Sequence, residues 1–266
     1  MIKVLGLGDV VYHFDCLDTP LRPGPPTPKQ MEVQRVQVEW LPGDLRGLVL
    51  TGDLQAREVG PQRRLAGEAL AEELEMLGEL GELPALRDMG VVLAGDLYTG
   101  PNLDRRGQAG DVRSVWRAFA RQSRFVAGVA GNHDLFGTPQ ETAQFAGEPE
   151  VYLLDGSRMG RPAGLRIGGV GGIVGSPDRP NRRDEHSYLA VVGMLMKQEP
   201  DILVTHEAPG YPGQGRPGRD GVGRVLESMR KGLVVCGHVH WDEPLLGLPE
   251  GGQVLNVHGR VLVLTV

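Results

Sequence analysis

Five short polar blocks, GDLQ, GDLY, GNHD, VTHEAP and GHVH, each follow a run of apolar residues in this sequence. Their polar side chains are carboxylates, an amide and imidazoles: Asp53, Asp96, Asn132, His206, His238 and His240. Mixed oxygen and nitrogen donors of this kind suit Mn²⁺, Fe or Zn²⁺ better than an all-oxygen Mg²⁺ or Ca²⁺ cage. The repetition therefore predicts a metal centre built from residues that are far apart in the chain.

The apolar runs before these blocks predict buried strands. We expect strands at Gly47–Thr51, Gly90–Ala94, Phe125–Ala130, Ile202–Thr205 and Leu233–Cys236, and a last one in VLVLTV at the end of the chain. Between them lie segments with a helical apolar stripe, such as the one that contains Ala66, Leu70, Leu74 and Leu77. Strands alternating with helices indicate a layered α/β sheet, in which ligands bind beyond the carboxyl ends of the strands.

Three local features are also predicted. Asp111 and Ser187 are expected to cap helices, and the glycine-rich section from 151 to 174 is expected to form β-hairpins.

The first 45 residues predict a short strand followed by an exposed, proline-rich loop from Leu17 to Thr27. We assign 1–45 to the same single domain as 46–266, which carries all of the polar blocks. Asp9, after the apolar run Lys3–Leu7, is a second choice for the first aspartate of the metal centre. It ranks below Asp53, because strand and helix lead directly from Asp53 to Asp96.

Composition narrows the function classes. The chain has 266 residues, 40% of them hydrophobic, and a formal net charge of -6 without a polybasic stretch, so strong binding to duplex nucleic acid is not expected. Bound divalent cations can still attract a phosphate. Cys16 and Cys236 are too few and too far apart for a disulfide framework. No apolar run approaches the length that crosses a membrane, and we expect a cytoplasmic protein.

The five blocks, in this order, resemble the calcineurin-like metallophosphoesterase family over roughly residues 46–266. The resemblance implies a four-layered α/β sandwich that holds two divalent metals at one edge. One metal (site 1) would be bound by Asp53 and His240, the other (site 2) by Asn132, His206 and His238, and Asp96 would bridge them. His133 would act as general acid toward the leaving oxygen, and Asp134 would orient it or raise its pKa.

The implied activity is hydrolysis of phosphomonoester or phosphodiester bonds through a metal-bridging hydroxide. Mn²⁺ is the preferred metal, with Fe or Zn²⁺ as alternatives. The expected substrate is a small phosphate ester, nucleotides included. The rival hypothesis is a non-catalytic scaffold with this fold, which would have no reason to keep His133. A nucleotide-binding oxidoreductase is disfavoured because no dinucleotide fingerprint is present.

The first block departs from the family, which usually has DxH where Gln55 stands here. Gln55 is either a weak ligand of site 1 or an ordinary loop residue. Tyr98 is expected to line the pocket or to pack. Arg182 and Arg183 either clamp a substrate phosphate or form a solvated pair.

Three histidines, His13, His186 and His258, have no motif around them and are expected to be structural or exposed.

Overall fold

A computed structural model describes residues 2–20, 22 and 24–266. Its α-helices are α1 (Ala66–Glu79), α2 (Arg113–Gln122), α3 (Pro139–Phe145), α4 (Glu185–Met196) and α5 (Asp220–Leu226). Short 3-10 turns occur at Leu86–Asp88, Pro162–Gly164 and Pro212–Gln214. In the described residues, no helix is long and apolar enough to cross a membrane.

The larger sheet contains both terminal regions of the chain. Its order is β4 (Ala56–Glu58), β1 (Val4–Asp18), β2 (Thr27–Val38), β17 (Val261–Thr265), β3 (Gly47–Thr51), β5 (Met89–Leu93), β7 (Phe125–Gly128) and β9 (Val151–Leu153). The strands β3, β5, β7 and β9 are parallel to one another, and β17 runs antiparallel to β3. The carboxyl ends of β3, β5 and β7 therefore meet at one edge.

The smaller sheet is built in the same way. β10 (Ile167–Val170), β13 (Ile202–Thr205), β14 (Leu233–Cys236) and β16 (Gln253–Asn256) are parallel, and β15 (Leu245–Gly247) is antiparallel to β16. Two pairs of short strands lie outside the sheets: β11 (Ile173–Val174) with β12 (Arg182–Arg183), and β6 (Gly110–Asp111) with β8 (Asp134–Leu135).

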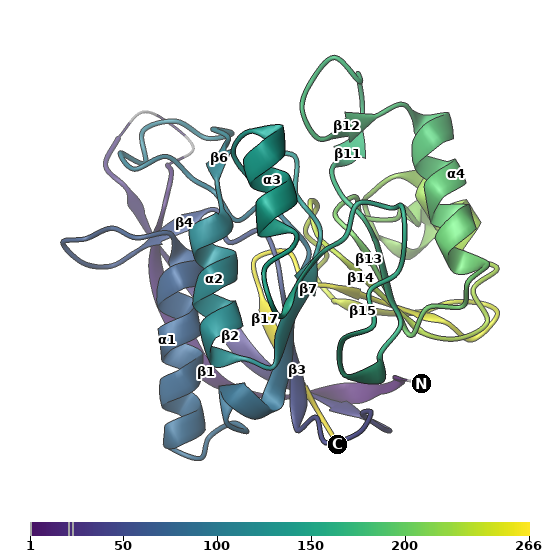
Figure 1. Ribbon diagram of the computed structural model, residues 1–266, viewed down its shortest axis with the longest axis horizontal. Coiled ribbons are helices and arrows are strands. Elements are labelled where there is room, and N and C mark those ends of the chain that lie inside the picture. The colour runs from purple at the N-terminus through teal and green to yellow at the C-terminus, as the bar shows by residue number, and fades with distance from the viewer. Residues whose placement is uncertain (1, 21, 23) are drawn as a thin grey trace.

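Successive side chains of a strand point to opposite faces of its sheet, so each sheet packs on both faces. The result is three hydrophobic cores between four layers. In β3, Val49 packs toward α1 and α2, whereas Leu48 and Leu50 pack toward the smaller sheet. In β13, Val204 faces the larger sheet, and Leu203 packs toward α4 and α5. Figure 1 shows α1 and α2 together on one flank and α4 on the other. The predicted four-layered, single-domain α/β sandwich is confirmed.

The amino-terminal loop was predicted nearly at its observed bounds, but the short strand before it was wrong and the strand after it was missed. β1 is a strand of 15 residues that pairs with the 12-residue β2, so the expected loop begins after Asp18 and ends before Thr27. Leu21 and Pro23 of the expected loop, and Met1, lie outside the described residues. β1 also passes straight through Asp9, which is exposed, so the alternative start of the metal centre is excluded. Few positions in β1 are buried, and they do not give the regular period-2 pattern that would have revealed the strand.

Two further local predictions need correction. The glycine-rich section does not form hairpins, because β9 joins the larger sheet and β10 joins the smaller one. Glycine-rich turns occur both in hairpins and in connections between two sheets. The sequence therefore does not show that the chain passes from the larger sheet to the smaller one in this section. The cap of α4 is Asp184, whose carboxylate accepts the N–H of Ser187 at 2.9 Å, and α2 begins after Val112 rather than Asp111.

Candidate metal centre

The polar blocks converge at the edge where the two sheets meet. Asp53, Asp96 and Asn132 follow β3, β5 and β7 of the larger sheet, and His206 and His238 follow β13 and β14 of the smaller one. The carboxyl ends of parallel strands lie on one side of a sheet. This topology explains how residues up to 185 positions apart come into contact, as Asp53 and His238 do.

The turns that carry these residues have unusual backbone conformations. Asp53 and Asp96 both have φ of 54°, and His238 has φ of 65°. Left-handed conformations of non-glycine residues store strain and concentrate at functional sites. The neighbouring glycines are required sterically: a Cβ atom on Gly131 would collide with Asp96, and one on Gly237 would collide with the Asp53 carboxylate. The Gly-Asp, Gly-Asn and Gly-His pairs thus serve close packing of these loops.

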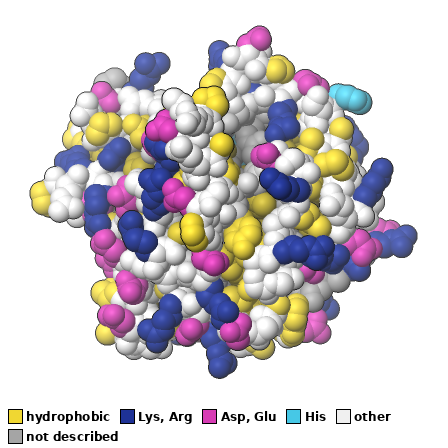
Figure 2. Space-filling model, viewed as in Figure 1, with side chains coloured by type: hydrophobic (Ala, Val, Ile, Leu, Met, Phe, Trp, Pro, Cys, Tyr) yellow, Lys and Arg dark blue, Asp and Glu magenta, His cyan; other side chains and the backbone are white. Residues whose placement is uncertain are grey.

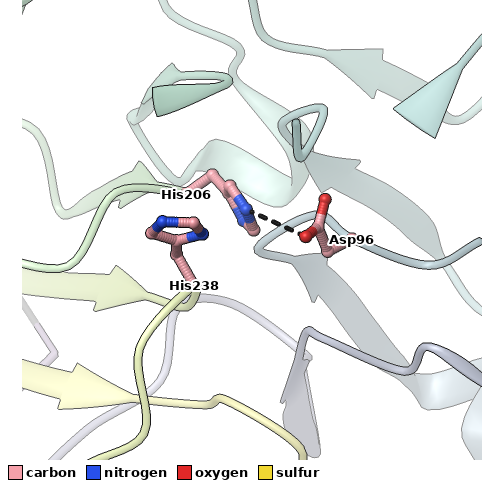
Figure 3. A group of neighbouring side chains, drawn as sticks. All are labelled: Asp96, His206 and His238. Carbon is pink, nitrogen blue, oxygen red and sulfur yellow. Dashed lines mark ion pairs between the residues drawn. The ribbon is translucent and has the colours of Figure 1, made fainter. Parts of the chain in front are cut away.

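Asp96, His206 and His238 form the tightest cluster, shown in Figure 3. One ligand-type atom of each lies within 4.8 Å of those of the other two. The Nε2 atom of His206 is 3.4 Å from the Asp96 Oδ2 atom and 3.2 Å from the Asn132 Oδ1 atom. Two atoms that each bind a common ion at about 2.1 Å lie about 3 Å apart at a right angle. Site 2 therefore has the donors and the spacing for a divalent transition-metal ion.

His206 is held in one orientation by its other nitrogen. Its Nδ1 atom is 2.7 Å from the Ala94 carbonyl oxygen, so a neutral ring donates there and presents the lone pair of Nε2 to the cluster. Both His206 and Asp96 are buried. The hydrogen bond and the burial thus fix the orientation of the His206 ring toward Asp96.

Electrostatics at the cluster favour a positive charge. Burial opposes ionisation of Asp96, but the charge of His206 and the hydrogen bonds of His206 and His133 lower the pKa of Asp96 to about 2. Burial likewise opposes protonation of His206, yet Asp96 and Asp53 raise its pKa to about 10. Burial and the charge of His206 lower the pKa of His238 to about 4. A divalent cation would supply the same positive charge and compete with the proton on His206.

Asp53 and Gln55 lie beside this cluster. The Gln55 amide nitrogen donates to Asp96 Oδ2 at 3.1 Å. Asp53 Oδ2 accepts the N–H of His238 at 2.9 Å, and Asp53 Oδ1 lies 3.1 Å from the Nδ1 atom of His258. The structure thus places Gln55 at the centre and adds His258, which sequence analysis assigned to the structural or exposed histidines. No motif surrounds it in the sequence, and the strand β16 that precedes it was not among the predicted strands.

His240 has a more peripheral position than the resemblance implies. Its side chain is 52% exposed, and its Nε2 atom lies 3.3 Å from Arg260 and 4.0 Å from Asp242. Burial and the charge of Arg260 lower the pKa of His240. Its ring centre is 5.8 Å from that of His258, so it stays a neighbour of site 1, and its role as a ligand stays a prediction.

Asp134 has other partners than the one expected. Its buried carboxylate accepts the backbone N–H groups of Asp96, Leu97 and Gly131, each at 2.8 Å. Burial and the charge of Asp96 raise the pKa of Asp134 to about 7. In the described residues no hydrogen bond joins this carboxylate to the His133 ring, which instead lies beside Gly107. Asp134 is thus a positioning residue for the Asp96 loop.

A cavity of about 130 Å³ opens beside Asp53 and Gln55. Tyr98, Lys29 and Arg106 line it. Arg106 donates to the Thr19 carbonyl oxygen at 2.8 Å and to the Asp18 carboxylate at 3.1 Å. Lys29, in contrast, forms no ion pair with any carboxylate in the described part of the chain. The hairpin missed in the sequence thus contributes an unpaired cation to the cavity next to the metal centre.

Arg182 and Arg183 line a different cavity, of about 390 Å³. Arg182 donates to the Pro180 carbonyl oxygen at 3.2 Å, and Arg183 to the Asp155 carbonyl oxygen at 2.9 Å.

Sequence comparison identifies the family to which the chain belongs. Among the curated proteins none matches the chain. One similar solved structure is sulfate thiohydrolase SoxB of Thermus thermophilus in complex with glycerol, with 17% identity and a TM-score of 0.40. The similarity covers 75% of this chain and 42% of that one. A family model described as calcineurin-like phosphoesterase matches residues 48–242. With most of its length matched by that model, the chain belongs to the calcineurin-like phosphoesterase family.

Proposed function

We propose that this chain hydrolyses small phosphate esters with two divalent ions bound at the edge between the sheets. Mn²⁺ is the preferred ion, with Fe or Zn²⁺ as alternatives. The observation that carries the proposal is the convergence of Asp96, Asn132, His206 and His238, with Asp53 in contact with the His238 backbone. Bound ions of this kind supply Lewis acidity and lower the pKa of a water molecule.

The side chains around the centre have separate tasks in this proposal. His206 and Asp96 hold the ions through atoms that are already oriented. His133 is half-buried, its backbone N–H donates to Asp96 Oδ1 at 2.9 Å, and its ring lies beside Gly107, which lines the cavity. From there it would donate a proton to the leaving oxygen. The Lys29 ammonium group would attract the negative charge of the ester.

The size of the cavity favours a small substrate. A volume of about 130 Å³ admits a phosphate group and part of its leaving group, and a larger leaving group would extend into solvent. Positive and negative side chains are interspersed over the face in Figure 2, which shows no broad basic surface for a polyanion. A nucleotide would bind through its phosphate at the metal centre.

The test is a substrate panel with matched variants. Metal-free protein is supplied separately with Mn²⁺, Fe²⁺, Zn²⁺ or Mg²⁺ and offered an aryl phosphomonoester, an aryl phosphodiester and cyclic nucleotides. We expect turnover with Mn²⁺ that His206→Ala abolishes and His186→Ala, a change of an exposed histidine, preserves. Metal binding without turnover of any ester would favour the scaffold hypothesis, and absence of metal binding would refute the site itself.

A further inference from the structure

His258 is fixed against the turn that carries Asp53. It forms a parallel bridge with Gly52, and the next residue, Gly259, donates its N–H to the Gly52 carbonyl oxygen at 3.0 Å. The His258 N–H is 3.2 Å from the Asn256 side-chain oxygen. Asn256 in turn donates to the carbonyl oxygen of Val239 at 2.8 Å. These contacts join the end of β16 both to the Asp53 turn and to the loop that contains His238 and His240.

The Nδ1 atom of His258 is directed into the centre without satisfying any hydrogen bond. It is buried and, within the described residues, has no hydrogen-bond partner, although the Asp53 Oδ1 atom is only 3.1 Å away. A buried polar nitrogen in this state costs free energy unless something else binds it. Two donor atoms about 3 Å apart are spaced as neighbouring ligands of one ion are.

The two oxygens of the Asp53 carboxylate have different partners, which leaves one of them free to bind an ion. Its Oδ2 atom accepts the N–H of His238, so Oδ1 remains for a cation. Gln55 donates to the Asp96 carboxylate instead, and His240 is turned toward Arg260. Of the residues near Asp53, His258 is therefore the one whose imidazole nitrogen approaches its free oxygen.

We propose that His258 is a ligand of site 1 through Nδ1, and that it supplies the imidazole which Gln55 does not. This inference rests on the proposed function, since it requires a metal centre at this edge. An oxygen of Asp53, the bridging Asp96 and this imidazole form a mixed donor set, which binds Mn²⁺, Fe²⁺ or Zn²⁺ more tightly than Mg²⁺.

The alternative is a purely structural histidine that supports the Asp53 turn. The two roles differ in what replaces the side chain. A ligand can be replaced by free imidazole in solution, which enters the space left by His258→Ala and binds the ion. A structural histidine would leave the ion's ligands complete, so imidazole would have no effect on affinity.

The experiment is a titration of metal-free protein with Mn²⁺. Binding is measured by calorimetry and by electron paramagnetic resonance, which distinguishes free from bound ion. His258→Ala is compared with wild type and with His186→Ala, and circular dichroism verifies the fold of each. We expect His258→Ala to weaken one ion by about tenfold or more, His186→Ala to leave both unchanged, and imidazole to restore part of the loss. Should His258→Ala fail to fold, His258→Gln takes its place.

The outcomes separate the two proposals. Wild-type protein that binds no Mn²⁺ contradicts the proposed function. Wild-type protein that binds Mn²⁺ with the same affinities as His258→Ala overturns the assignment of His258 alone. A loss of affinity that imidazole does not reverse at any concentration would also overturn it in favour of the structural role.

Discussion

Replacement of Asp134 should lower stability more than any other single change near the metal centre. Its carboxylate accepts three backbone N–H groups, from Asp96, Leu97 and Gly131, in a fully buried position. Each buried donor left without a partner costs about 1–3 kcal/mol. Removal of a buried charge offsets part of that cost, and for Asp134→Ala we expect a net loss of about 3–5 kcal/mol. That is a large share of the roughly 5–15 kcal/mol by which domains are stable.

Asp134→Asn should be milder, at about 1–3 kcal/mol. The amide oxygen can take the place of Oδ2, which accepts from Asp96 and Gly131, but its NH₂ group then faces the N–H of Leu97. The assay is urea unfolding of metal-free protein followed by circular dichroism, because bound ions would add stability of their own. Asp9→Ala, an exposed position on β1, is the control and should stay within about 0.5 kcal/mol.

A change of less than about 1 kcal/mol for Asp134→Ala, together with lost turnover, would refute this reasoning. It would mean that the carboxylate acts on His133 after all, as the sequence suggested, and that the backbone contacts are incidental.

Three further predictions concern the centre itself. Asp96→Asn keeps an oxygen for the His133 N–H but removes the charge near His206, so turnover should fall by about a hundredfold or more and circular dichroism should stay unchanged. Gln55→His should tighten site 1, whereas Gln55→Ala should loosen it if the amide is a ligand; equal Mn²⁺ affinities in all three proteins would exclude Gln55. Lys29→Ala should raise KM by about tenfold while kcat changes little, because the ammonium group attracts the ester without entering the bond-breaking step; an unchanged KM in steady-state assays would exclude that role.

Sequence patterns were sufficient for the central strands, because each is a continuous apolar run that ends in a polar block. Ile202–Thr205 and Leu233–Cys236 were predicted at their observed bounds. The β1–β2 hairpin was missed because buried and exposed positions do not alternate regularly along its strands. Pairing with β17, from the other end of the chain, stabilises it, and such a contact is not encoded locally.

The residues of the candidate site likewise fall into those that local sequence patterns identify and those that only long-range contacts place. Asp96, His206 and His238 belong to recognisable blocks, and the structure brings them together. His258 stands in NVHGR, which has no motif, and its position beside Asp53 depends on β17 pairing with β3. Asp134 was expected to act on His133, but its carboxylate binds three backbone N–H groups instead. Only the fold reveals that these groups surround it.

The chemistry of the centre is divided between the two sheets. The loops of the larger sheet contribute oxygens, from Asp53, Asp96 and Asn132, whereas the loops of the smaller sheet contribute imidazoles, from His206 and His238. An ion bound by both kinds of donor would therefore connect the two sheets across their shared core, and its affinity would depend on how closely the sheets pack. Large-to-small changes in that core, such as Val204→Ala, which removes no donor atom, would thus weaken metal binding by shifting one set of ligands against the other. Loss of metal in a variant is evidence for a lost ligand only when the packing between the sheets is intact.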